Sequence, residues 1–410
     1  MNETRAFNSQ AEADAFLAPR LDRPCQEGVT ALAGGVTFTR RVVELGGGAF
    51  TNVYETAWRA SAASASVALS DAPVTAHAHA SATPDCVAVS TGGFFYLIDG
   101  SPVAPRALSL NLAIDRGRVR SLPVVDQECL DDRGGALSVS VLPARGALTL
   151  DGVALRWAGA RTAHEAECEA WGNAVCAIEH HADVRTGKVR RLVDASRFTP
   201  RRASSDGRCD LALRARGDGA FVALEARPEG GVDVFGYDLV LRVPRELARA
   251  DAVVRVTSIG PWHLDEAGFS AISAGPSLMS NLAAHPLHRE PCLGSAALLA
   301  DRPAARLLFV VTRDGTQRLC LFDGRPGSDV FPGVGFEAAA ALVRARHDVV
   351  AGCFLDSGHT ARVVVREETT VTGHGNRHYL RWPSPDDTRF VWSPSAGRAT
   401  PSLLVVRVRR

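Results

Sequence analysis

Short apolar runs that end in turn-forming residues recur along this 410-residue chain, and they constrain its fold more than any other feature. Between residues 36 and 157 the runs are separated by turn signals such as Gly46-Gly47-Gly48, Asp115-Arg116-Gly117 and Asp151-Gly152. Short runs bounded by Gly and Asp are typical of β-strands. Strong helix formers with an apolar face occur at residues 336–346, and a second helix is plausible at residues 11–17. The sequence therefore predicts an α+β protein with a strand-rich mixed sheet and few helices.

The order of elements near the C-terminus predicts one connection. The helix at residues 336–346 lies between an apolar run at 319–322 and another at 349–355. A strand, a helix and a second strand in this order favour a crossover onto the same sheet.

Composition excludes several classes of partner. The net charge is +1 and the charged fraction is 22%, so we expect no nucleic-acid partner and no membrane partner. The N-terminus lacks an apolar signal segment, and no run reaches the roughly 18 apolar residues of a membrane span, which favours a cytoplasmic location. Nine cysteines without a Cys-x-x-Cys pair predict buried thiols rather than a zinc site.

Domain organisation is predicted from changes in texture along the chain. Residues 1–85 form a strand-rich lead-in that packs on a main domain of residues 86–410, with an insertion at about 160–250. Within it, residues 160–210 are polar and rich in charge. His77-Ala78-His79 is interpreted as strand, with both imidazoles on one face and no nearby carboxylate to complete a metal site.

Residues that could carry chemistry follow several predicted strands. Residues 349–355 lead into Asp356-Ser357-Gly358-His359, so a buried strand delivers a carboxylate to a tight turn. Asp356 is either an acid–base residue or a turn residue that binds the backbone. His359 is a general base, a neutral hydrogen-bond donor or a side chain that fills a pocket. Asp323 and Arg325 also fit a hairpin turn.

Five motifs in order resemble the phosphodiester glycosidase family. They are Thr91-Gly92-Gly93-Phe94-Phe95, Ala274-Gly275-Pro276-Ser277-Leu278, the Arg306 strand with its Arg313-Asp314-Gly315 turn, Asp323-Gly324-Arg325-Pro326-Gly327, and Phe354-Leu355-Asp356-Ser357-Gly358. The family has Asn at the positions of Thr91 and Phe354, and glycines at those of Ser357 and His359. The strand that follows Arg306 also lacks the family's Thr and Gly.

The resemblance implies a phosphodiester glycosidase-like fold and a bacterial hydrolase that cleaves a sugar–phosphate bond. The substrate would be a phosphorylated sugar or nucleoside, including nucleotide sugars, in a small-molecule pathway such as natural product biosynthesis. No cofactor is expected, and a divalent metal is left open. The implied catalytic residues are Asp356 and His359. The implied substrate-binding residues are Thr91, Gly92, Gly93, Arg306, Asp323, Ser357 and Gly358.

Hydrolysis of a sugar–phosphate bond requires hydrogen-bond donors that bind the phosphodiester group. Backbone N–H groups of the Gly92-Gly93 turn and the guanidinium of Arg306 are the candidates. Two alternatives remain. The pocket is repurposed for transfer, lyase chemistry or rearrangement on a sugar or nucleoside, or the protein binds a ligand without catalysis.

Overall fold

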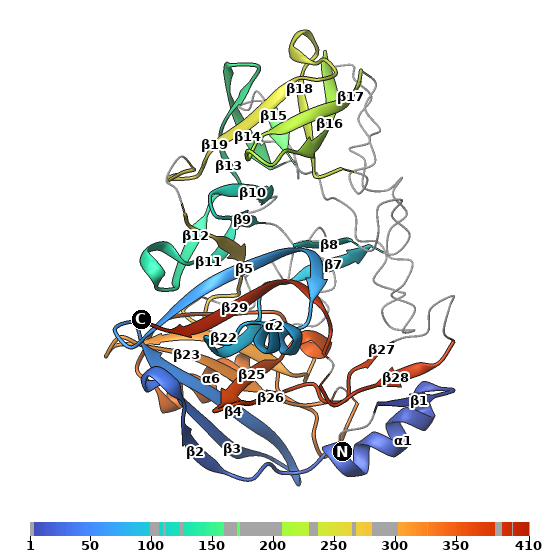
Figure 1. Ribbon diagram of the computed structural model, residues 1–410, viewed down its shortest axis with the longest axis vertical. Helices are drawn as coiled ribbons and strands as arrows, with labels where there is room; N and C mark the ends of the chain where they lie inside the picture. Colours follow the sequence, from blue (N-terminus) through green and yellow to red (C-terminus); the bar gives the residue numbers. More distant parts are fainter. Residues whose placement is uncertain are drawn as a thin grey trace.

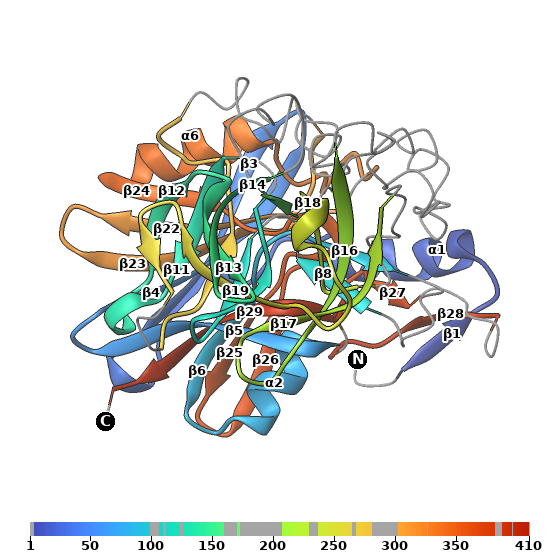
Figure 2. The same ribbon diagram turned by 90° about the horizontal axis from the view of Figure 1, so that it is seen from above.

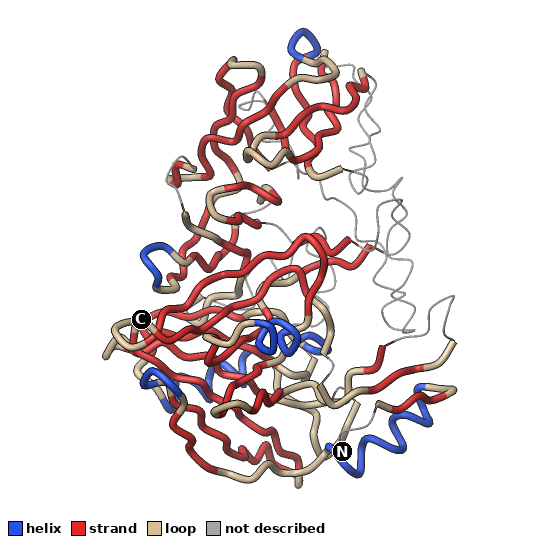
Figure 3. The backbone as a smooth tube through the Cα atoms, viewed as in Figure 1, coloured by secondary structure: helices blue, strands red, loops and turns tan. Residues whose placement is uncertain are grey.

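The computed structural model describes residues 4–98, 106–109, 112–123, 126–159, 170–172, 207–228, 237–264, 268–280, 302–325, 327–381, 388–395 and 397–409. Strands dominate these residues and helices are few, which confirms the predicted strand-rich α+β class (Figure 3). Among the described residues, no helix is long and apolar enough to cross a membrane.

Two large sheets face each other across the main core. The first has the order β2 (Gly28–Ala31), β3 (Thr37–Gly46), β4 (Ala49–Arg59), β23 (Thr316–Phe322), β22 (Arg306–Thr312) and β24 (Val349–Phe354). The second has the order β26 (Thr370–His374), β25 (Val363–Glu367), β6 (Cys86–Thr91), β29 (Thr400–Val408) and β5 (Ala63–Val74). Tyr54, Trp58 and Phe309 of the first sheet pack with Val363 and Leu404 of the second. Alternation along each strand places these side chains on the inner faces.

A helix covers the outer face of each sheet, and the two lie on opposite sides of the molecule (Figure 2). The predicted helix at 336–346 is confirmed as α6 (Phe336–Arg346), whose apolar face packs on Leu308 and Val310 of β22. Strands β23 and β24 both pair antiparallel with β22, so they run parallel to each other. The predicted crossover onto one sheet is therefore confirmed.

The second outer helix corrects a prediction. Residues 76–82 form α2 (Ala76–Ala82), which packs on the five-stranded sheet, and not a strand. The Thr75 hydroxyl accepts a hydrogen bond from the Ala78 N–H at 3.0 Å and caps the helix. Residues two apart on a helix point in widely different directions, so His77 and His79 do not share a face.

A second body of strands lies beyond the main sheets, at the top of Figure 1. It has the order β13 (Arg145–Leu150), β14 (Val153–Gly159), β15 (Ala170–Gly172), β18 (Leu239–Pro244), β16 (Arg208–Ala215), β17 (Phe221–Arg227), β19 (Val253–Ile259) and β20 (Trp262–His263). Because β13 also pairs with β19, the sheet closes on itself around Trp157, Phe221 and Leu241. Strands on both sides of residues 160–250 belong to this one sheet.

Smaller elements join these bodies. A five-stranded sheet with the order β10 (Arg118–Ser121), β9 (Ala113–Asp115), β21 (Ala271–Ser273), β11 (Gln127–Asp131) and β12 (Ser138–Leu142) lies between them (Figure 1). Strands β7 (Phe95–Ile98) and β8 (Arg106–Ser109) form a hairpin-like pair. Short 3-10 turns are η1 (Ala33–Gly35), η2 (Arg133–Gly135), η6 (Arg245–Leu247) and η9 (Gly358–Thr360).

The N-terminal residues form a unit with a segment from the other end of the chain. The predicted helix at 11–17 is confirmed, and extends over α1 (Gln10–Leu21), with Ser9 as its N-cap. It packs with a three-stranded sheet of β1 (Arg5–Phe7), β28 (Phe390–Trp392) and β27 (Leu380–Arg381). Phe7, Leu17 and Trp392 are buried between these elements.

Candidate functional site

The turn after β24 meets the turn after β6 where the two main sheets adjoin. The N–H of Asp356 donates to the carbonyl of Gly92 at 2.9 Å, and the N–H of Gly358 donates to Ala305 at 2.8 Å. The N–H of Thr91 donates to the carbonyl of Arg362 at 3.1 Å. The structure therefore brings the predicted Thr91-Gly92 and Asp356-Ser357-Gly358 segments together, although some 260 residues separate them in sequence.

Asp356 is a buried carboxyl with few stabilising contacts. Its side chain is 6% exposed, and one oxygen accepts the Ser357 N–H at 2.8 Å. Burial raises the pKa of Asp356 to about 7, although Arg398, the Ser357 N–H and the Thr360 hydroxyl each oppose the rise. A carboxyl that titrates near neutrality can both give and take a proton at physiological pH, as a general acid–base residue must. The hydrogen bond from the Ser357 N–H is also the kind of contact expected if Asp356 is only a turn residue that binds the backbone.

His359 lies on the same turn and presents its ring to solvent. Desolvation by the surrounding protein, with the positive charges of Arg398 and His378, lowers the pKa of His359 to about 4. The ring is therefore neutral at pH 7 and can donate or accept a hydrogen bond. The Asn376 side-chain amide donates to the His359 carbonyl and holds the turn from below.

Arg398 is the cation of this site, and the sequence reasoning missed it. It acts electrostatically on both Asp356 and His359, so the three groups lie near one another. Its guanidinium stacks over the ring of Phe95, 5.2 Å from the centroid. Arg398 belongs to no motif and follows Gly397 in a loop before β29, so no local pattern marks it. A half-buried guanidinium that acts electrostatically on a carboxyl and a neutral imidazole suits an anionic ligand.

The predicted phosphate cradle at Gly92 and Gly93 stays a prediction, and both amides have acceptors within the fold. The Gly92 N–H donates to the Ser402 carbonyl at 3.0 Å, and the Gly93 N–H donates to the Ser402 hydroxyl at 3.1 Å. Both amides are therefore engaged within the fold. The Thr91 hydroxyl likewise accepts the Arg362 N–H at 3.3 Å. The Gly92 carbonyl accepts the Asp356 N–H, so the Gly-Gly turn positions the Asp356 turn. Hydrogen-bond donors for a ligand would then come from side chains such as Arg398.

These two glycines are required for close packing. A Cβ at Gly92 would lie 2.6 Å from the Ser402 hydroxyl, and a Cβ at Gly93 would clash with the carbonyl oxygen of Ser273. We expect Gly93→Ala to destabilise the protein by roughly 3 kcal/mol or more, because backbone blocks the new methyl group and overpacking already costs about 1–3 kcal/mol where side chains can give way. Chemical denaturation measures the change.

Gly217→Ala is the matched control for this prediction. Nothing lies within 4 Å of a Cβ at Gly217, and its φ is not in the left-handed region. Its stability should stay the same or rise by up to about 1 kcal/mol. Equal stability of the Gly93→Ala and Gly217→Ala variants would contradict the packing described here.

The side chain of Arg306 contacts the start of α6. Its Nε donates to the Val334 carbonyl at 3.1 Å, and its guanidinium stacks over Phe336 at 4.2 Å. Alternation along β22 places this side chain with Leu308 on the α6 side. These contacts hold Arg306 at the start of α6, and its predicted grip on phosphate stays a prediction.

Asp323 lies in the connection from β23 to α6 and not in the hairpin turn that was the predicted alternative. One carboxylate oxygen accepts the N–H of Gly324 and the N–H of Asn376, each at 2.9 Å. Through Asn376 it supports the loop that holds the His359 carbonyl. Arg325 pairs with Asp22 at the end of α1. A direct contact of Asp323 with substrate stays a prediction.

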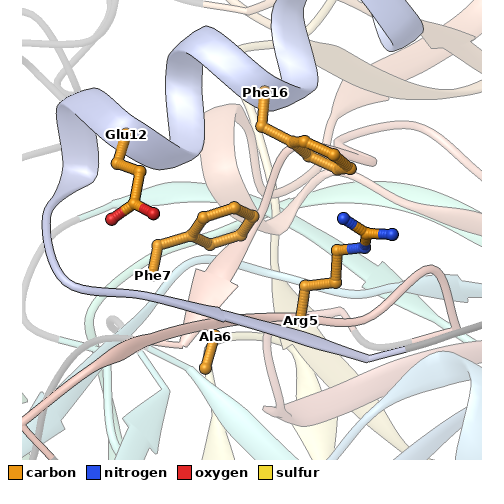
Figure 4. Close-up of a pocket in the computed structure, with 5 residues that line it drawn as sticks. All are labelled: Arg5, Ala6, Phe7, Glu12 and Phe16. Carbon is orange, nitrogen blue, oxygen red and sulfur yellow. The ribbon is translucent and has the colours of Figure 1, made fainter.

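A surface pocket of about 400 Å³ lies elsewhere, between β1 and α1 (Figure 4). Arg5, Phe7, Glu12 and Phe16 line it, and the two aromatic rings lie 5.5 Å apart. None of the predicted site residues lies there. Among the described residues, no group of three or more His, Cys, Asp or Glu side chains is placed to hold a metal ion.

Comparison with known proteins finds structures of similar fold but identifies no family. No family model and no curated protein matches the sequence. The structure is similar to that of a hypothetical protein from Synechocystis, with a TM-score of 0.55, 13% identity and coverage of 94% of this chain. The chain spans 64% of the length of that protein. This likeness shows a shared fold.

Two weaker likenesses were also found. One is to a protein named as exported from Burkholderia pseudomallei K96243, with a TM-score of 0.49, 19% identity, and coverage of 97% of this chain and 81% of that one. The other is to the catalytic domain of zebrafish N-acetylglucosamine-1-phosphodiester alpha-N-acetylglucosaminidase, auto-inhibited by its pro-peptide. Its TM-score is 0.35 at 12% identity, with coverage of 100% of this chain and 88% of that one.

Proposed function

We propose that this protein has a phosphodiester glycosidase-like fold and that the Asp356 turn is its active site, where a sugar–phosphate bond is hydrolysed in a small-molecule or nucleotide-sugar substrate. The single observation that carries the proposal is a buried carboxyl whose pKa burial raises to about 7 within the electrostatic reach of the Arg398 guanidinium. Perturbed carboxyls with a cation beside them favour catalytic sites. The ordered motifs of the sequence supply the reaction class.

Each group has a defined role in the proposed reaction. Arg398 binds the phosphodiester and stabilises the phosphomonoester that leaves with the electron pair of the bond to the anomeric carbon. The ionised form of Asp356 takes a proton from the water that attacks this carbon. The neutral ring of His359 is a hydrogen-bond partner for a sugar hydroxyl or for the water.

The experiment is to incubate the purified protein with a panel of sugar-1-phosphodiesters and nucleotide sugars. Products are identified by mass spectrometry, with and without a chelator. We expect free sugar and a phosphomonoester, with no product from Asp356→Asn. Loss of activity with chelator alone would add a metal to the reaction. If no member of the panel is cleaved, the proposal is wrong for this substrate class.

A second candidate is the repurposed pocket, and one observation favours it. The Gly92 and Gly93 amides are engaged with Ser402, so a backbone cradle for phosphate is not open in this conformation. Turnover of a panel member without free sugar would indicate transfer, lyase chemistry or rearrangement. Thermal stabilisation by a member that is not turned over would indicate a binding protein.

A further inference from the structure

Arg362 is a buried arginine beside the candidate site, and the proposed reaction does not use it. Its side chain is 2% exposed, and its Nε and Nη1 have no acceptor among the described residues. Burial lowers the pKa of Arg362 to about 10, even though the Asp323 carboxylate opposes this. Burying a guanidinium with unpaired donors is costly. An apolar residue of the same volume could be buried at a lower cost in free energy. We therefore expect the guanidinium to contribute more than its volume.

The contacts of Arg362 join β26 to segments that build the site. Its Nη2 donates to the Pro394 carbonyl at 3.1 Å, and its backbone pairs with Thr91 in both directions. Its side chain passes between two glycines: a Cβ at Gly397 would lie 2.8 Å from its Cδ, and a Cβ at Gly373 would clash with the guanidinium. Only residues without a side chain fit against this planar group.

Gly397, one of the two glycines against the Arg362 side chain, is the residue immediately before Arg398. We propose that Arg362 is a positioning residue, which fixes Pro394 and Gly397 so that Arg398 faces Asp356 and His359. On the far side of Arg398, Thr400 begins β29 and its hydroxyl donates to the Ser402 carbonyl at 2.7 Å. Arg362 and β29 thus hold the backbone on both sides of Arg398. The inference rests on the proposed function only in taking Arg398 as the group that binds the anion.

His359 reports the position of Arg398 without any need for a substrate. The positive charge of Arg398 is one cause of the low pKa of His359, and Arg362 is not among the causes. If Arg362 holds Arg398 in place, its removal should raise the pKa of His359 indirectly. A role in stability alone would leave that pKa unchanged.

The test is an NMR titration of the His359 ring, assigned with His359→Gln, in a set of variants. Arg398→Met and Arg362→Met should each raise the pKa of His359 toward its ordinary value. Arg362→Lys keeps the charge but lacks the planar group, so it should behave like Arg362→Met. If Arg362→Met does not fold, Gly397→Ala disturbs the same contact and keeps both arginines.

Arg366→Met is the matched control. Arg366 lies in β25, four residues after Arg362 and on the same side of the extended chain, and its Nε donates to the Cys86 carbonyl at 3.1 Å, next to α2 rather than the site. Its removal should lower stability and leave the titration of His359 unchanged. If Arg362→Met and Arg362→Lys also leave it unchanged, Arg362 has no positioning role.

Titration with inorganic phosphate separates this inference from the proposed function. We expect phosphate to bind the wild-type protein and to bind Arg398→Met and Arg362→Met at least about tenfold more weakly, and Arg366→Met equally well. If phosphate does not bind the wild type, Arg398 is not an anion site and the proposed function loses its support. The His359 titration still decides whether Arg362 positions Arg398.

Discussion

Replacing Asp356 by Asn is expected to abolish turnover and to raise the free energy of unfolding at pH 8. Turnover should fall on the order of 100- to 10,000-fold, because the amide cannot accept the proton of the attacking water. The stability gain follows from the pKa of the carboxyl, which is raised from 3.8 to about 7 in the fold. The folded protein thus keeps a proton that the unfolded chain releases from about pH 4 upward, and stability falls as the pH rises to about 7.

The size of the gain is bounded by the same linkage. One pKa unit corresponds to about 1.4 kcal/mol, so the ionised carboxyl destabilises the fold by about 4 kcal/mol above pH 7. Asn removes this effect and still accepts the Ser357 N–H, so denaturation at pH 8 should show a gain of a few kcal/mol at most. At pH 4 the variant and the wild type should have equal stability.

Asp132→Asn is the control for this variant. Asp132 is a half-buried carboxyl outside the site that accepts the N–H groups of Val67 and Ser270, at 3.0 Å and 2.6 Å. Burial raises the pKa of Asp132 as it does that of Asp356, but Asn keeps only one oxygen for the two N–H donors, so the two effects on stability oppose each other. The control therefore rests on turnover, which should be unchanged in Asp132→Asn. Full turnover in Asp356→Asn, or a loss of stability at pH 8, would show that Asp356 is a turn residue and not the acid–base group.

Replacing Asp22 by Asn should give the largest loss of stability among single changes outside the main cores. The Asp22 carboxyl binds His378 at 2.7 Å, the Ser328 hydroxyl at 3.0 Å, and the Arg325 guanidinium. Burial alone would raise its pKa, but the bonds from His378 and Arg325 outweigh burial and bring the pKa to about 2. Removing one partner of a buried pair costs about 3–5 kcal/mol, because the remaining charges stay buried without compensation.

The pH dependence of this contribution has the opposite sign to that of Asp356. The pKa of Asp22 is lowered, so its stabilisation is complete above about pH 4 and is lost as the pH falls through about 2. Denaturant unfolding of the wild type and Asp22→Asn should therefore differ most at neutral pH and converge in acid. Limited proteolysis should also release the α1 unit faster in the variant, since Asp22 joins α1 to Arg325.

Asp348→Asn is the control for Asp22→Asn. Asp348 pairs with Arg313 at 2.7 Å, but both side chains are more than 60% exposed. Exposed pairs contribute about 0–1 kcal/mol, so this change should be nearly neutral. A loss of stability as small in Asp22→Asn would mean that the buried cluster does not hold α1.

The candidate site was predictable where it lies at the end of one strand. Asp356, Ser357 and His359 were found because an apolar run stopping at a carboxylate is a local pattern, and β24 ends at Phe354 as the pattern required. The Gly92 turn was found for the same reason. Its predicted role stays untested, but the acceptor of its amides is Ser402, about 310 residues later in the chain. Sequence spacing does not show which acceptor a turn amide will meet.

Several other predictions are not tested by the structure. Most of residues 160–210, predicted to be polar and rich in charge, lie outside the described residues. The division into a lead-in of residues 1–85 and a main domain stays a prediction, although β4 and β5 pair directly with β23 and β29. Hydrolase activity and a cytoplasmic location also remain proposals.

The sequence by itself determined the strand-rich class, the helix at 336–346, the crossover that contains it and the carboxylate turn, because periodicity, propensity and turn residues act over a few neighbours. Only the tertiary structure decided which distant groups surround Asp356. Arg398 and Arg362 reach the site through the pairing of β6, β25 and β29, and Arg306 is turned toward α6 by the alternation of its strand. The pKa of a carboxyl depends on burial and on charges in space, so its acid–base character is a property of the fold and not of the motif that carries it.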